Sequence, residues 1–141
     1  MEKLSIEEFN KLNLKDKCIH MWEWVVENPD KEKEDFFTYM GIPYKDQPAS
    51  HCYACEYVRK LSPTAHLECK LCPVDWAFYE ELYAFNEDDG ICERHGSPYQ
   101  DWVNNHYNNY LDDEEYNERV TYAAKEVLEC VKRTWKVDDN T

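Results

Sequence analysis

The sequence predicts a mainly α-helical single domain with an irregular centre, and a small α+β arrangement is the alternative. Three observations support this. Apolar residues follow helical spacing at both ends of the chain, only 3 glycines are present, and four regularly spaced cysteines interrupt the helical pattern in the middle. At 141 residues the chain suits one domain. We expect N-terminal helices in residues 1–50, the cysteine-bearing centre in 51–96 and C-terminal helices in 97–136.

The N-terminal part is predicted to begin with two helices. Ser5 and Glu8 form a capping box, in which the side chain of each residue bonds to the backbone N–H of the other. A second helix is expected over Lys15–Glu27, where apolar residues recur at the spacing of a buried stripe: Cys18, Ile19, Trp22, Val25 and Val26. Met21 and Trp24 fall off this stripe, and we interpret them as flanks of the core rather than as an exposed contact surface.

A third helix is predicted to run from Asp30 to Met40. Asn28 would be its N-cap and Pro29 its first residue, where the missing N–H of proline costs nothing. Gly41 would end the helix in the left-handed conformation that glycine adopts easily. A loop over 42–50 then leads to the first cysteine pair.

The C-terminal part is predicted to contain two longer helices. Ser97 and Gln100 form a second capping box, which opens a helix that runs to about Tyr110. The last helix is capped by the acidic run 112–115 and ends near Trp135. Between the two parts, 56–61 suits one or two helical turns, and the aromatic-rich 77–85 fits either a helix or a strand.

Two Cys-x-x-Cys pairs, Cys52/Cys55 and Cys69/Cys72, carry the clearest chemical signal, with 13 residues between them. A Cys-x-x-Cys turn lets two sulfurs reach one ion from the same side, and a second pair completes a tetrahedron with metal–sulfur bonds of about 2.3 Å. We therefore predict one structural Zn²⁺ at the centre of the fold. A structural zinc can contribute on the order of 10 kcal/mol to folding, so its expected role is to join the two helical parts.

Other uses of the cysteines stay open. The odd total of seven and the charged N-terminus favour a reducing compartment, where disulfides rarely persist. An iron–sulfur cluster could use the same four thiolates, and a redox pair would need a βαβ context that the pattern lacks. Cys92, His51 and His66 are alternative ligands that lie near the pairs or in a turn-like segment. Cys18 and Cys130 lie among apolar residues, and we interpret them as core.

The chain is acidic, and its charge is unevenly distributed. The net charge is −14, and from Leu71 to Glu118 there are 13 acidic residues against one basic residue, Arg94, which gives this window −12. Phosphate contacts need clustered Lys and Arg, so direct nucleic-acid binding is not expected. No apolar run approaches the roughly 20 residues of a membrane span. We expect a soluble, cytoplasmic protein without a membrane partner.

We do not expect an enzyme. The residue types of a metal-dependent His–Asn–His nuclease are present at His95, Asn104, Asn105 and His106. Their spacing is tight, however, and His106 falls on the inward face of its predicted helix, which favours a core histidine. A Cys–His hydrolase would need an exposed Cys18 or Cys130 with a lowered pKa, and neither has basic neighbours arranged to produce one.

The acidic surface indicates binding to another protein. Carboxylates on a metal-clamped scaffold can dock on a basic groove, including one built for nucleic acid, because they can stand where phosphates would stand. The alternative is that the charge only keeps the protein soluble. The residues expected to contact a partner are Glu80, Glu81, Glu87, Asp88, Asp89, Asp112, Asp113, Glu114 and Glu115.

A family resemblance indicates which kind of organism encodes the protein. The segments 52–57 and 69–76, a later Cys92, then Tyr99 and Trp102 resemble the pattern of small zinc-binding Cys-x-x-Cys proteins of Firmicutes phages and prophages. The segment 18–24 followed by Asn28-Pro29 is similar too. The resemblance covers roughly residues 15–110 and most of the last helix. It implies a phage source, a bound metal and a conserved place for a fifth cysteine, but no activity.

A phage source gives the binding hypothesis a direction. Small acidic phage proteins often act against the host cell or its defences. We therefore expect a zinc-stabilised acidic protein that docks on a basic surface of a host protein and inhibits it in the manner of a DNA mimic. The alternative is a metal-dependent nuclease of the His–Asn–His kind, or an accessory to one.

Overall fold

The computed structural model describes residues 4–48, 51–61, 73–74, 98–107 and 112–135. The elements in these ranges are α1 (Ile6–Asn10), α2 (Leu14–Glu27), α3 (Lys33–Met40), the 3-10 turn η1 (Tyr44–Asp46), α4 (Tyr53–Leu61), α5 (Pro98–His106) and α6 (Asp113–Thr134). No strand occurs among the described residues. The predicted mainly α fold class is therefore confirmed for this part of the chain.

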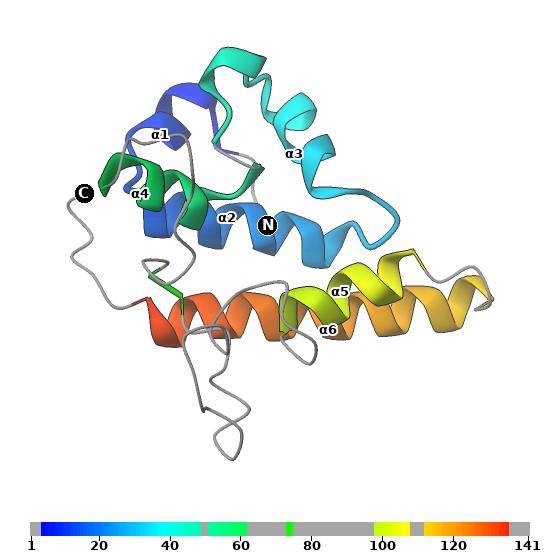
Figure 1. The fold of residues 1–141 in the computed structure, drawn as a ribbon. Helices are drawn as coiled ribbons and strands as arrows, with labels where there is room; N and C mark the ends of the chain where they lie inside the picture. Colours follow the sequence, from blue (N-terminus) through cyan, green and yellow to red (C-terminus); the bar gives the residue numbers. More distant parts are fainter. Residues whose placement is uncertain (1–3, 49–50, 62–72, 75–97, 108–111, 136–141) are drawn as a thin grey trace.

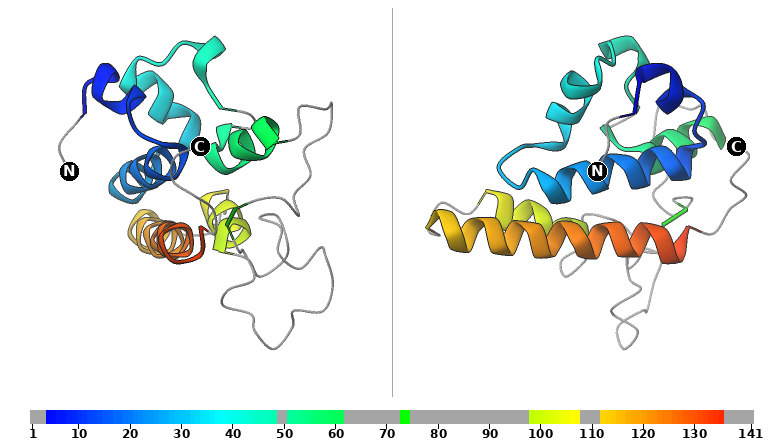
Figure 2. Two further views of the ribbon diagram at one scale, coloured as in Figure 1. Left: turned by 90° about the vertical axis from the view of Figure 1, so that its left-hand side faces the viewer. Right: turned by 180° about the vertical axis from the view of Figure 1, so that it is seen from behind.

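Helix α2 lies at the centre of the fold. It packs against α6 on one side and against α3 and α4 on the other, while α5 packs against α6. Figure 1 shows α2 and α6 side by side and antiparallel, and the end-on view in Figure 2 shows α5 beside α6. Buried apolar residues from the N-terminal and C-terminal helices belong to one core. The two helical parts are thus joined directly by packing.

The central position of α2 explains why two of its residues that lie off the predicted stripe are nevertheless buried. Met21 is fully buried and Trp24 is only 6% exposed, because neighbouring helices cover α2 on more than one face. Both residues therefore lie in the core itself rather than at its flanks as predicted, and neither belongs to an exposed contact surface. The stripe itself is less uniform than predicted, since Ile19 and Val26 are only partly buried.

Several predicted helix ends are confirmed by their hydrogen bonds. The Ser5 hydroxyl accepts from Glu8 N at 3.1 Å, and Ser5 N donates to the Glu8 carboxylate at 3.2 Å. The Asp112 carboxylate accepts from Glu115 N at 2.8 Å at the start of α6. Gly41 closes α3 with a φ of 74°, a left-handed conformation that strains residues with a Cβ.

The predicted start of the third helix is wrong. Asn28 ends α2 instead: its N–H bonds to Val25 O at 3.1 Å and its side-chain amide donates to Trp24 O at 2.8 Å. An asparagine side chain can donate to backbone carbonyls at the end of a helix, and it can also accept from backbone N–H groups at the start of one. Helix α3 begins at Lys33, with Glu32 as N-cap.

Two other boundaries also differ from the prediction. Helix α4 begins at Tyr53, several residues before the expected helical turns, and so includes Cys55. Helix α5 ends at His106 rather than near Tyr110. The predicted cap at Ser97 and the undecided segment 77–85 lie outside the described residues.

Candidate metal centre

The first cysteine pair lies at the N-terminus of α4. Cys52 directly precedes the helix and its carbonyl accepts from Glu56 N at 3.0 Å, while Cys55 lies in the first turn. Both thiols are free of disulfides and half-buried. The N-terminal end of a helix favours negative charge because its N–H groups are unpaired and its dipole is positive there. The pair is therefore placed where a thiolate is stabilised.

The surroundings of Cys52 act on its acidity. The hydrogen bond from the Cys55 side chain, the charge of Lys33 and the backbone N–H groups of Cys55 and Ala54 outweigh the effect of burial and lower the pKa of Cys52 to about 6. A shift in this direction favours the thiolate over the thiol. Thiolates are the form in which cysteine binds Zn²⁺, so the described half of the predicted donor set has suitable chemistry.

Lys33 supplies a buried positive charge beside this pair. Its side chain is 9% exposed, and its ammonium donates a hydrogen bond to the Tyr99 hydroxyl at 2.7 Å and lies 4.8 Å from the centre of the Tyr99 ring. Burial by itself would lower the pKa of Lys33, but the Cys52 thiolate and then the Tyr99 oxygen raise it above its ordinary value. Lys33 therefore stays charged and offsets negative charge on the sulfurs.

His51, one of the alternative ligands, has a partner of its own. Its φ of 52° lies in the left-handed region, which is uncommon for a residue with a side chain. The imidazole Nδ1 lies 3.5 Å from the Glu34 carboxylate, and the ring lies 5.6 Å from that of Phe37. Among the described residues, then, His51 is directed toward α3.

The second cysteine pair, Cys69/Cys72, lies outside the described residues, as do Cys92 and His66. Within the described ranges there is no group of three or more metal-ligating side chains. These ranges contain two of the four predicted thiolates, so the tetrathiolate site stays a prediction. Pro73 and Val74, which directly follow Cys72, are buried, and Val74 belongs to the same core as α2 and α6.

The predicted partner-binding residues divide in the same way. Glu80, Glu81, Glu87, Asp88 and Asp89 lie outside the described residues. The run 112–115 is described and lies at the start of α6, where Asp112 to Glu114 are exposed. Glu115 is half-buried and pairs with Arg119 at 2.8 Å.

A second group of acidic residues joins this run at one end of the molecule. Asp30, Glu32, Glu34 and Asp35 lie in the connection from α2 and the first turn of α3, and the Tyr107 hydroxyl, just after α5, donates to Glu32 at 3.0 Å. Burial and then the charges of Asp30 and Glu32 raise the pKa of Tyr116 in α6, so these carboxylates are within electrostatic reach of α6. Figure 1 shows the α2–α3 connection and the start of α6 at the same end of the fold.

We call this surface the acidic end. Its members are Asp30, Glu32, Glu34, Asp35, Asp112, Asp113, Glu114 and Glu115. Sequence reasoning missed the first four because two lysines, Lys31 and Lys33, alternate with them and mask the charge. In the fold the side chain of Lys33 is directed inward toward Tyr99. Of the two lysines in this segment, Lys33 therefore does not offset the charge of the carboxylates at the surface.

The described candidates for a nuclease site are engaged in the structure of their own helices. His106 is 8% exposed and stacks on Trp102 with 5.0 Å between ring centres. Asn104 accepts from the Gln100 amide at 3.0 Å, and the Asn105 amide donates to Asp101 O at 2.8 Å. The interpretation of His106 as a core histidine is confirmed, while His95 lies outside the described residues.

Cys18 and Cys130 are also core residues, as predicted. Cys18 is 1% exposed and Cys130 is fully buried, so neither presents a thiol to a substrate in solution. In the part of the chain that the structure describes, no helix is both long and apolar enough to cross a membrane. Comparison of the chain with known protein families, curated proteins and solved structures gave no match.

Proposed function

We propose that the protein is a zinc-stabilised acidic binding protein, encoded by a phage, that docks on a basic surface of a host protein and inhibits it. The observation that carries the proposal is the acidic end. Two segments far apart in the sequence, 30–35 and 112–115, bring carboxylates to one end of the fold. A surface of this kind accelerates association with a basic partner and repels nucleic acid.

Several carboxylates of the acidic end are held in place by hydrogen bonds. Glu32 and Asp35 form a capping box at the start of α3, and Asp112 caps α6. Tyr107 bonds to Glu32 and so ties α3 to the residue after α5. Carboxylates held on rigid elements lose little conformational entropy when a partner binds, which is what a DNA mimic requires.

The proposal is tested by capturing partners from a host lysate with the full-length protein at low and high salt, with double-stranded DNA as competitor. We expect a partner that is retained at low salt, released at high salt and displaced by DNA. The double variant Asp113→Asn/Glu114→Gln should weaken capture. The matched control, Glu7→Gln/Asp46→Asn, removes the same charge from exposed sites outside the acidic end and should not.

Two outcomes would overturn the proposal. If no partner is captured at any salt concentration, or if both double variants weaken capture equally, the acidic end is not a docking surface. Mg²⁺-dependent DNA cleavage that His95→Ala abolishes would support the nuclease alternative instead.

A further inference from the structure

The first half of α3 lies against the residues on both sides of Cys52. The Glu34 carboxylate lies 3.5 Å from Nδ1 of His51, and the Phe37 ring lies 5.6 Å from that of His51. The centre of the Phe37 ring is also 6.3 Å from that of Tyr53. Because His51 and Tyr53 are the chain neighbours of Cys52, these contacts hold Cys52 beside α3.

Lys33, the first residue of α3, brings a positive charge to this contact. Its side chain is buried, so water screens its interactions less than those of a surface lysine. The Cys52 thiolate favours the charged form of Lys33, and the Lys33 ammonium favours the thiolate. The two groups are therefore within electrostatic reach of each other.

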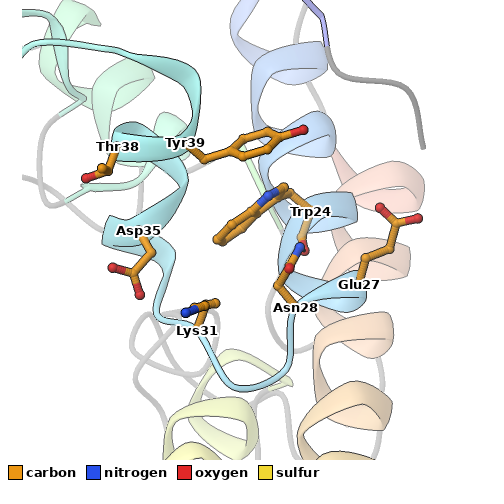
Figure 3. Close-up of a pocket in the computed structure, with 7 residues that line it drawn as sticks. All are labelled: Trp24, Glu27, Asn28, Lys31, Asp35, Thr38 and Tyr39. Atoms are coloured by element: carbon orange, nitrogen blue, oxygen red, sulfur yellow. The ribbon is translucent and has the colours of Figure 1, made fainter.

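The position of this ammonium is fixed by α5, in the other helical part. The Tyr99 hydroxyl accepts a hydrogen bond from it at 2.7 Å, and the centre of the Tyr99 ring lies 4.8 Å away. Lys31, two residues earlier, is exposed and lines the groove between α2 and α3 together with Trp24 and Asp35 (Figure 3). Lys31 thus lies on a different surface and provides a matched control for Lys33.

We propose that Lys33 strengthens the binding of Zn²⁺ from outside the set of ligands, an inference that rests on the zinc-stabilised fold proposed above. Four thiolates carry more charge than one Zn²⁺ neutralises, so the predicted centre is negative overall. A fixed cation beside Cys52 offsets part of this charge and favours the thiolate that binds metal. Tyr99 acts indirectly, because it holds the ammonium in position.

The experiment measures metal binding by the full-length protein. Zn²⁺ affinity is determined by competition with a chelator of known affinity, and Co²⁺ is titrated in parallel because its absorption reports thiolate ligands. Lys33→Met removes the charge but keeps a long side chain, and it should lower Zn²⁺ affinity by roughly tenfold to hundredfold. Tyr99→Phe keeps the charge but releases the ammonium from its acceptor, and it should lower the affinity by less.

Two further variants separate the charge from the packing of the side chain. Lys33→Arg keeps a cation and should retain most of the affinity. Lys31→Met removes the same charge from the exposed lysine and should change neither the affinity nor the Co²⁺ absorption. Wild-type affinity in Lys33→Met, or an equal loss in Lys33→Met and Lys33→Arg, would overturn the inference. If circular dichroism shows that Lys33→Met does not fold, unchanged affinity in Tyr99→Phe would overturn it instead.

The outcomes also separate this inference from the proposed function. A wild-type protein that binds neither Zn²⁺ nor Co²⁺ through thiolates would overturn the metal centre and, with it, the role of Lys33. One thiolate-bound zinc whose affinity does not depend on Lys33 would overturn the role of Lys33 alone. Zinc affinity that depends on Lys33, in a protein that captures no partner, would support this role and count against the docking function.

Discussion

The ammonium of Lys33 donates a hydrogen bond to the hydroxyl of Tyr99 at 2.7 Å and so connects α3 to α5 through a nearly buried charge. A buried ammonium is costly unless its donors are satisfied and an opposite charge lies near. Tyr99 supplies an acceptor and Cys52 the negative charge. This arrangement connects the first cysteine pair to both helical parts of the fold.

Tyr99→Phe should destabilise the protein by about 1.5–3 kcal/mol, because it removes one acceptor of a charged, buried donor but keeps the ring. Urea denaturation followed by circular dichroism measures the change. Tyr44→Phe is the control, since Tyr44 is 84% exposed and should change stability by less than about 0.5 kcal/mol. Equal stability of Tyr99→Phe and the wild type would show that the hydrogen bond contributes nothing.

Met21→Ala should destabilise the protein by about 2–5 kcal/mol, because it leaves a cavity in a fully buried part of α2. The matched variant is Ile6→Ala, at a residue that is 36% exposed, where a much smaller loss is expected. The same urea titration measures both. A loss of less than about 1 kcal/mol for Met21→Ala would mean that α2 is not covered on this face.

The stability of the protein should fall as the pH drops from about 7 to about 5. Burial lowers the pKa values of His20 and His106 in the folded state, although Glu23 opposes the shift for His20 and Glu32, Glu34 and Asp35 oppose it for His106. As the pH falls through the ordinary value of about 6.5, the unfolded state therefore binds more protons than the folded state, which favours unfolding.

Urea denaturation at a series of pH values measures this effect, and NMR titration of the two imidazoles checks its cause. His106→Gln should flatten the pH dependence. Nδ1 of His106 lies 3.2 Å from the Tyr116 hydroxyl, which donates its hydrogen to His106 O at 2.8 Å. Histidine pKa values at or above 6.5 in the folded protein would contradict the prediction.

The sequence was most informative where a structural signal is local. The caps at Ser5, Gly41 and Asp112 depend on residues within one helical turn, and all three were predicted correctly. Asn28 was placed at the wrong helix because its amide can bond at either end, and the choice depends on where the chain turns. A capping residue shows that a helix begins or ends nearby, but it does not always show which helix it caps.

Features that depend on tertiary packing were beyond reach of the sequence. Met21 and Trp24 looked peripheral because a single stripe cannot show that two sets of helices cover α2. The acidic residues of 30–35 were missed because charge counting treats Lys33 as a surface cation, while the fold buries it against Tyr99. The proximity of this segment to α6 follows from the antiparallel packing of α2 and α6.

The metal centre is tested most directly by the zinc content of the purified protein, measured per chain in the wild type and in cysteine variants. We predict one zinc in the wild type and in Cys130→Ala, whose thiol is buried in the core away from solvent, and loss of zinc in Cys52→Ser and Cys69→Ser. A wild-type protein without zinc, or full zinc content in Cys52→Ser, would contradict the proposed tetrathiolate site.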